Sequence, residues 1–147
     1  MSTVAIYLNF QGNAEAAFTY YKSVFKTEYS MPIMRIKDLP PDEKAPKFAE
    51  KELNYVMHVA LPITGGTELM GTDMLESMGH KLVIGNNTTI NLLLDTKEEA
   101  DTLYKALSKN GSDKQDMRDE FWGYWGCCQD QFGIRWMFNV LNDQKFN

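Results

Sequence analysis

The fold is decided by two stretches, AIYLNFQGNAEAAFTYYKSVF at residues 5–25 and TINLLLDTKEEADTLYKAL at residues 89–107. Each has the pattern of a short strand of alternating character that leads directly into an amphipathic helix. The helical parts match at an offset of 83 positions, with apolar residues at i, i+3, i+4 and i+7. This spacing places the apolar residues on one face of each helix. They are Ala17, Tyr20, Tyr21 and Val24 in the first stretch, and Ala100, Leu103, Tyr104 and Leu107 in the second. The match indicates an internal repeat of two related modules.

The ends of the two helices carry recognisable signals. Asn13 is a suitable N-cap for the first helix, and Thr96 with Glu99 forms a capping-box pattern for the second. The pair Asn110-Gly111 is a suitable C-terminal stop for the second helix.

Three candidate strands follow each helix, so each module has the order βαβββ. The sequence therefore predicts an α+β fold, a single domain over residues 1–147, with module one at about 1–75 and module two at about 83–147. A charged loop with three prolines, residues 37–52, interrupts the first module, and its prolines exclude a regular strand. The candidate strands are residues 28–36, 54–63 and 67–73 in module one, and 113–121, 122–130 and 134–140 in module two.

One helix can cover only one face of a small sheet, so each module leaves a face uncovered. Two such faces turned toward each other would form a cleft of the kind that binds small molecules. Strand alternation assigns Tyr7 and Asn9 to the cleft side in module one, and Asn91 in module two. The residues between them, such as Leu8 and Leu92, then face the helices.

The composition excludes several classes of partner. A net charge of −5 and a pI near 5.0 argue against nucleic-acid binding, which depends on clustered Lys and Arg. No apolar stretch approaches the roughly 20 residues needed to cross a bilayer. The N-terminus lacks the pattern of a signal peptide, so we expect a cytoplasmic protein. The adjacent Cys127 and Cys128 cannot make a disulfide framework, and we expect buried, inert thiols.

The chain resembles the PhnB-like branch of the vicinal oxygen chelate superfamily, which includes glyoxalases and bleomycin-resistance proteins. The resemblance lies in YLNFQGNAEAAFTYYKSVF (7–25), VMHVALPITGGTELMGTD (56–73) and WGYWGCCQDQFGIRWMFNV (122–140). It implies paired βαβββ modules and a homodimer. Members of this branch are sometimes labelled demethylubiquinone methyltransferases. The only glycine pair, Gly65-Gly66, lies between two candidate strands and opens no helix, so the sequence gives this label no chemical support.

The resemblance also implies where a metal would be bound. Metal-dependent members carry ligands on the first and last strands of each module, which here correspond to positions at or beside Ala5, Thr89, Met70 and Met137. None of these residues suits a hard or borderline divalent ion, because such ions prefer carboxylate and imidazole donors. We therefore expect no metal and no cofactor, with the two methionines packing in an apolar wall.

Two titratable residues are candidate catalytic groups. If His58 and Asp73 approach each other, the carboxylate could orient the imidazole as a general base. In the alternative interpretation, Asp73 caps a turn and His58 makes only local hydrogen bonds. The aromatic residues near the C-terminus, among them Trp122, Trp125 and Trp136, could stack on a planar ligand or build the core and a dimer interface. The expected ligand-binding residues are Tyr7, Asn9, Met70, Asn91, Trp136 and Met137.

Three functions remain open at this point. The favoured one is binding of a small organic molecule in the inter-module cleft without the usual divalent metal. The alternative is an atypical enzyme of the superfamily, resembling its lyases, isomerases or dioxygenases, that uses His58 and Asp73 as acid and base or as shifted metal ligands. The third is an interaction module whose dimer surface matters more than its cleft. Whether the protein is an enzyme stays open.

Overall fold

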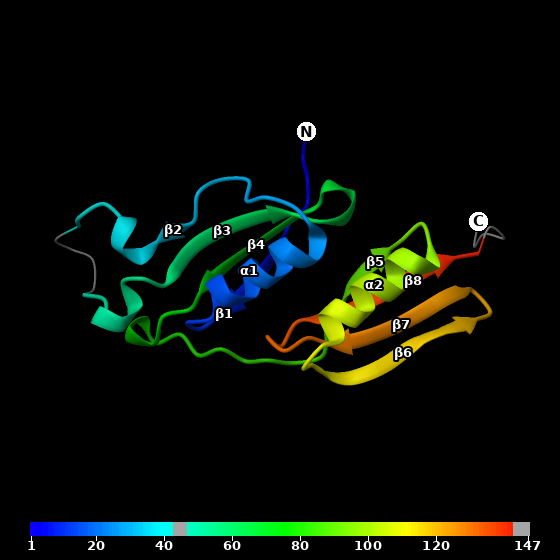
Figure 1. Cartoon of the computed structure of the whole chain (residues 1–147). Coiled ribbons are helices and arrows are strands. Elements are labelled where there is room, and N and C mark those ends of the chain that lie inside the picture. Colours follow the sequence, from blue (N-terminus) through cyan, green and yellow to red (C-terminus); the bar gives the residue numbers. More distant parts are fainter. Residues whose placement is uncertain (43–46, 143–147) are drawn as a thin grey trace. The chain divides into compact units, whose positions relative to one another are not determined.

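The computed structural model describes residues 1–42 and 47–142 and divides into two compact units, Met1–Val83 and Ile84–Asn147. Each unit contains one four-stranded mixed sheet and one α-helix. Figure 1 labels these elements along the chain. The predicted α+β fold built from βαβββ modules is confirmed.

The first unit contains β1 (Ile6–Phe10), α1 (Ala14–Phe25), β2 (Met34–Arg35), β3 (Val56–Pro62) and β4 (Glu68–Asp73). The strand order is β1-β4-β3-β2, with β1 and β4 parallel and the other pairs antiparallel. Four short 3-10 turns complete it, at Ile36–Asp38, Glu50–Glu52, Thr64–Gly66 and Glu76–Met78.

The second unit repeats this topology with β5 (Ile90–Leu93), α2 (Lys97–Ser108), β6 (Ser112–Glu120), β7 (Gly123–Gln129) and β8 (Arg135–Leu141). Its strand order is β5-β8-β7-β6, and only β5 and β8 are parallel. The repeat extends to the register, because Tyr7 lies opposite Met70 in one sheet and Asn91 lies opposite Met137 in the other. Met70 and Met137 therefore occupy equivalent positions.

The core of the first unit lies between α1 and the face of the sheet that the helix covers (Figure 1). Phe18 is fully buried and packs edge-on against Phe10 and Tyr21. The ring of Phe18 comes within 2.6 Å of where a side chain on Gly71 would begin, so any larger residue at this strand position would force Phe18 to move. The close approach of helix and sheet seals this face from water.

The core of the second unit uses the same faces with different side chains. On α2, Tyr104 occupies the position equivalent to Tyr21 and packs edge-on against Phe138 of β8. In the first unit the large side chain at this contact is Phe18 on the helix, which packs against Gly71 on the strand. In the second unit the large side chain is Phe138 on the strand. The opposite face of each sheet is left without a helix from its own unit.

The helix ends agree with the sequence patterns in part. The hydroxyl of Thr96 accepts a hydrogen bond from the Glu99 N–H at 3.1 Å, as expected for an N-cap. Asn13 stands at the N-cap of α1 but makes no side-chain cap bond. After α2, Asn110 takes a left-handed conformation with φ 59°, which supports the predicted stop.

One strand prediction was too long. The segment predicted as a strand at 28–36 contributes only Met34 and Arg35 to the sheet, with an irregular register opposite β3. Residues 43–46 of the Pro-rich loop 37–52 lie outside the described residues. In the part of the chain that the structure describes, no helix has the length and apolarity to cross a membrane.

Candidate functional site

A pocket of about 580 Å³ opens on the face of the second sheet that α2 does not cover. Alternation along β5 and β8 turns Asn91, Met137 and Asn139 to this face, while the intervening residues face the helix. The size lies within the range of about 300–1,000 Å³ typical of small-molecule sites. The lining residues are Asn91, Leu93, Phe121, Trp122, Trp125, Met137, Asn139 and Leu141.

The aromatic wall of the pocket comes from the hairpin of β6 and β7. Trp122 packs edge-on against both Phe121 and Trp125, with ring centroids 4.9 and 6.1 Å apart. Asn142 holds the turn, since its backbone N–H and side-chain amide donate to the carbonyls of Trp122 and Phe121. The guanidinium of Arg118 lies 5.0 Å from the centroid of the Trp125 ring. The rings thus form a fixed apolar surface.

Two amides and one indole supply the polar part of the pocket. The Trp122 Nε1–H donates to Asn139 Oδ1 at 3.1 Å, and Asn139 Nδ2 donates to Asn91 Oδ1 at 2.7 Å. Asn139 is buried, with 5% of its surface exposed, whereas Asn91 is exposed. The buried amide is therefore satisfied within the protein, and Asn91 is the polar side chain at the open surface.

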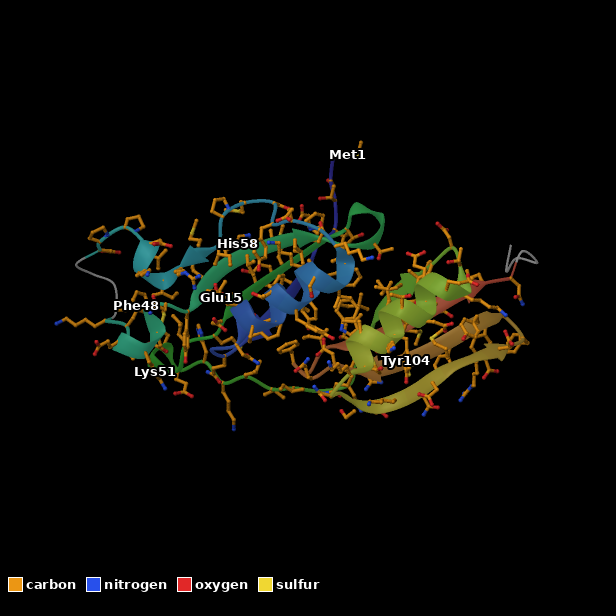
Figure 2. The ribbon with its side chains drawn as sticks, viewed as in Figure 1. Met1, Glu15, Phe48, Lys51, His58 and Tyr104 are labelled. Carbon is orange, nitrogen blue, oxygen red and sulfur yellow. The ribbon has the colours of Figure 1, made fainter. Side chains whose placement is uncertain are left out.

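The uncovered face of the first sheet holds Tyr7 and Asn9, as the alternation predicted, and also Met70. The Tyr7 hydroxyl shares a hydrogen bond with Nδ1 of His58 on β3 at 3.2 Å. His58 is labelled in Figure 2. Burial raises the pKa of Tyr7, and a hydrogen bond with Thr72 offsets part of the increase. The neutral form of the Tyr7 phenol is therefore favoured, and His58 has a hydrogen-bond partner within its own unit.

Asp73 has a structural role, and its contacts do not support the possible pairing with His58. Its two carboxylate oxygens accept hydrogen bonds from the backbone N–H groups of Gly12 at 2.7 Å, Ala14 at 3.0 Å and Val56 at 2.9 Å. Strand alternation places Asp73 on the buried face, 4% exposed, and His58 on the uncovered face. The alternative, in which Asp73 caps the turn before the first helix, fits these contacts.

Trp136 also lies elsewhere than expected. It is fully buried on the helix side of β8, one residue before Met137, and its indole N–H donates to Oδ2 of Asp130 at 2.8 Å. The prediction that Trp136 lines a ligand-binding surface is corrected by this placement. The error comes from taking Trp136 and Met137 together, although neighbours on a strand face opposite sides.

The residues at the metal positions implied by the superfamily do not fit a divalent ion. Met70 and Met137 stand at equivalent places on β4 and β8, with Tyr7 and Asn91 opposite them in the register. A thioether, a phenol and an amide are not the carboxylate and imidazole donors that such ions prefer. Among residues 1–42 and 47–142, no group of three His, Cys, Asp or Glu side chains could hold one.

The two thiols lack the chemistry of nucleophiles. Cys127 and Cys128 are both buried and unpaired. Burial raises the pKa of both thiols, that of Cys128 to about 12, and the nearby Asp130 carboxylate adds to the increase at Cys128. Neither thiol is ionised at neutral pH.

Sequence reasoning assigned part of this pocket and missed the rest. Asn91 and Met137, which the sequence assigned to an inter-module cleft, line this pocket, and their role in binding stays a prediction, while Asn139 was not considered. The signal for Asn139 was present, because it follows Met137 by two positions on the same strand and so shares its face. Trp122 and Trp125 were noted only as part of an aromatic cluster, since nothing in the sequence separates a turn residue that lines a pocket from one that fills a core.

The turn between β1 and α1 offers no phosphate or cofactor cradle. A side chain on Gly12 would begin 2.9 Å from the Tyr55 hydroxyl, and the Gly12 N–H already donates to Asp73. The pair Gly65-Gly66 lies in a 3-10 turn between β3 and β4, as the sequence indicated.

Comparison with known proteins gives a consistent family. The family model described as 3-demethylubiquinone-9 3-methyltransferase matches residues 2–139. Protein YjdN of Escherichia coli (strain K12) is 28% identical over 94% of this chain and 95% of its own length. The crystal structure of protein PA1353 from Pseudomonas aeruginosa is 28% identical, covers 97% of this chain and 100% of that one, and has a TM-score of 0.79.

Two further solved structures share the fold at lower identity. A PhnB protein from Bacillus cereus, described as a putative 3-demethylubiquinone-9 3-methyltransferase, is 23% identical with a TM-score of 0.73, covering 95% of this chain and 99% of that one. A glyoxylase/bleomycin resistance protein/dioxygenase domain from Frankia sp. EAN1pec is 11% identical with a TM-score of 0.64, covering 97% and 99%.

Proposed function

Because this chain belongs to the family described as 3-demethylubiquinone-9 3-methyltransferase, the PhnB-like branch of the vicinal oxygen chelate superfamily, we propose that it binds a small aromatic molecule without a divalent metal. The pocket of the second unit carries this proposal. It combines Trp122, Trp125 and Met137 with the amide of Asn91 in a space of about 580 Å³. Apolar walls with a few placed polar groups are the usual composition of a small-molecule site.

Binding without a metal follows from the side chains at the positions that the superfamily uses for ligands. Met70 and Met137 offer thioethers, which suit soft ions such as Cu(I) and not the divalent ions bound by carboxylate and imidazole. Elemental analysis of purified protein tests this point. We expect Zn, Ni, Mn and Fe each well below one per chain, and a stoichiometric metal that is lost in His58→Ala would contradict it.

We do not propose the methyltransferase activity that the family's description names. A methyl donor with a nucleoside group is usually held by a glycine-rich turn in a doubly wound parallel sheet. Each sheet here contains a single parallel pair, and the Gly12 turn is filled by Tyr55 and bonded to Asp73.

Thermal shift with a library of small aromatic molecules tests the binding function. At a ligand concentration a hundred times Kd, binding stabilises the folded state by about 2.7 kcal/mol, which raises Tm by several degrees. We expect hits that disappear in Trp125→Leu. They should persist in the control variant Tyr29→Leu, which removes an aromatic side chain from the first unit outside the pocket lining. The proposal fails if no aromatic compound shifts Tm, or if the hits persist in Trp125→Leu.

Acid–base catalysis by His58 is a second candidate, favoured by its hydrogen bond with Tyr7. Asp73 takes no part in it. The test is to incubate each hit with the protein and follow it by NMR for conversion. Turnover that is lost in His58→Ala would establish an enzyme, and unchanged ligands after prolonged incubation would remove this candidate.

The assembly and location remain predictions from the sequence. We propose a homodimer in the cytoplasm. Light scattering after size-exclusion chromatography tests the dimer, for which twice the chain mass of 16.9 kDa is expected.

A further inference from the structure

The hydrogen bonds in the pocket fix the orientation of Asn91. An indole N–H can only donate, so the atom of Asn139 that faces Trp122 must be its carbonyl oxygen. The Asn139 NH₂ group then faces Asn91, and it needs an acceptor, so the Asn91 oxygen must be turned toward it. The NH₂ group of Asn91 is left pointing away from this chain of bonds. One indole therefore determines the direction of two amides.

This NH₂ group is available to a ligand. Asn91 is exposed and lines the pocket beside Met137. Among the residues that the structure describes, none accepts a hydrogen bond from Asn91 Nδ2. Because its orientation is set before binding, a ligand that accepts from it meets an ordered donor and loses little additional freedom.

The pocket does not suit an ionised ligand. No charged side chain is among its lining residues. Arg118, whose guanidinium lies over the Trp125 ring, is paired with Glu120 at 2.6 Å and also donates to Gln115 at 3.2 Å. A charged ligand would lose water against Trp122 and Trp125 without gaining an opposite charge, which is unfavourable.

We propose that this site is specific for uncharged, planar aromatic molecules that carry a hydrogen-bond acceptor such as a ketone oxygen, and that Asn91 donates to this acceptor. The ring lies against Trp122, Trp125 and Met137, and the acceptor faces β5. The inference rests on the proposed function and narrows it to one class of ligand. Asn91 acts as the specificity-determining residue, and Trp122 and Asn139 position it.

Three probes of matched shape test the specificity. They are 2-acetylnaphthalene, with a neutral acceptor, 2-ethylnaphthalene, with none, and 2-naphthoate, which is ionised at neutral pH. We expect 2-acetylnaphthalene to bind about three- to tenfold more tightly than 2-ethylnaphthalene, the range that one net hydrogen bond gives. We expect 2-naphthoate to bind most weakly. Dissociation constants from isothermal titration calorimetry give the ratios.

A conservative variant tests the role of Asn91. Asn91→Asp keeps an acceptor for Asn139 but removes the donor, so the preference for 2-acetylnaphthalene over 2-ethylnaphthalene should disappear or reverse. Asn87→Asp adds the same charge to an exposed loop outside the pocket lining and should leave the ratio unchanged. Trp122→Phe removes the N–H that orients the amides and should reduce the ratio.

A measurement on the unmodified protein keeps the test independent of variant folding. The side-chain NH₂ signals of Asn91 in a ¹⁵N–¹H spectrum should shift on addition of 2-acetylnaphthalene and much less with 2-ethylnaphthalene. Equal affinity for these two probes, or a preference that survives in Asn91→Asp, would overturn this inference while leaving the proposed function intact. Failure of all three probes and of the wider aromatic library would overturn both.

Discussion

The two units share one topology and differ in the side chains on the face of the sheet that their own helix does not cover. Met70 and Met137 occupy the same place, with Tyr7 and Asn91 opposite them. In the first unit, Tyr7 bonds to a histidine on the next-but-one strand. In the second, Asn91 bonds to Asn139, which is held by Trp122. The same backbone thus presents a pair of titratable rings in one unit and a chain of amides in the other.

The difference follows from the length of one hairpin. In the second unit β6 has nine residues and pairs along β7, so the turn carries Phe121 and Trp122 to the pocket. In the first unit the corresponding strand, β2, has two residues, and the Pro-rich loop follows it. The repeat therefore preserves the sheet and helix, while the length of the outermost strand differs and with it the aromatic residues that reach the free face of the second sheet.

The largest expected effect concerns a buried carboxylate in each unit. Asp130 accepts hydrogen bonds from the N–H groups of Phe132 and Ile134 and from the indole of Trp136, and Asp73 accepts from three backbone N–H groups of its own unit. Replacing either with alanine removes the acceptor of three hydrogen bonds, which should cost about 3 kcal/mol at about 1 kcal/mol each. Urea denaturation measures the free energy of unfolding.

The matched control for these variants is Asp95→Ala, an exposed carboxylate that should change stability by less than about 0.5 kcal/mol. If Asp73→Ala behaves like this control while Asp130→Ala destabilises, the two carboxylates do not have equivalent roles, and the comparison between the units breaks at this point.

The second prediction separates two tryptophans of the second unit. Trp136→Phe removes the hydrogen bond to Asp130 inside the core and leaves a small cavity, so it should destabilise by about 2 kcal/mol. Because Trp136 faces the helix, the variant should bind aromatic ligands as the unmodified protein does. Trp122→Phe should lower the free energy of unfolding by only about 1 kcal/mol, and it should weaken ligand binding. Urea denaturation and calorimetry together test the pair.

Much of the fold could be predicted because periodicity and repetition are local properties of the sequence. The offset between Tyr21 and Tyr104 predicted two related helices, and alternation correctly assigned Leu8 and Leu92 to the buried face. The short β2 was missed because a strand's length depends on its partner, which the local pattern does not contain.

The candidate site was harder to predict because it depends on contacts between distant residues. Asp73 has the residue type of a general base, and only the structure shows that three backbone N–H groups occupy it. The bond from Trp122 to Asn139 spans 17 positions, and no sequence pattern indicates it. Trp136 was a different kind of error, since alternation from Met137 was sufficient to place it on the buried face.

The third prediction compares the two helix starts. Thr96→Ala removes the side-chain cap bond that Thr96 accepts from the Glu99 N–H at the start of α2, and it should cost about 1 kcal/mol. Asn13→Ala should cost less than about 0.5 kcal/mol, because Asn13 makes no cap bond and Asp73 already accepts from Ala14 N–H. A loss near 1 kcal/mol in Asn13→Ala would show that the asparagine caps α1 in solution.

The smallest effect concerns a tyrosine that a carboxylate keeps protonated. The Tyr124 hydroxyl donates to Asp101 Oδ1 at 2.7 Å, and this bond is the main cause that raises the pKa of Tyr124 from 10.0 to about 12. In the first unit, burial is the main cause that raises the pKa of Tyr7, so the two tyrosine pKa values are raised for different reasons.

The Tyr124 bond makes a stability contribution that depends on pH. Since the folded state favours the neutral phenol, the contribution is fully present below pH 10 and is lost as the pH rises from 10 toward 12. Asp101→Ala should lower the pKa of Tyr124 toward 10 and leave that of Tyr7 unchanged, whereas Asp95→Ala should alter neither. The chemical shift of the Tyr124 Cζ carbon, followed by NMR against pH, measures this directly. A Tyr124 pKa that stays near 12 in Asp101→Ala would assign the shift to burial, as in Tyr7, and would remove this difference between the units.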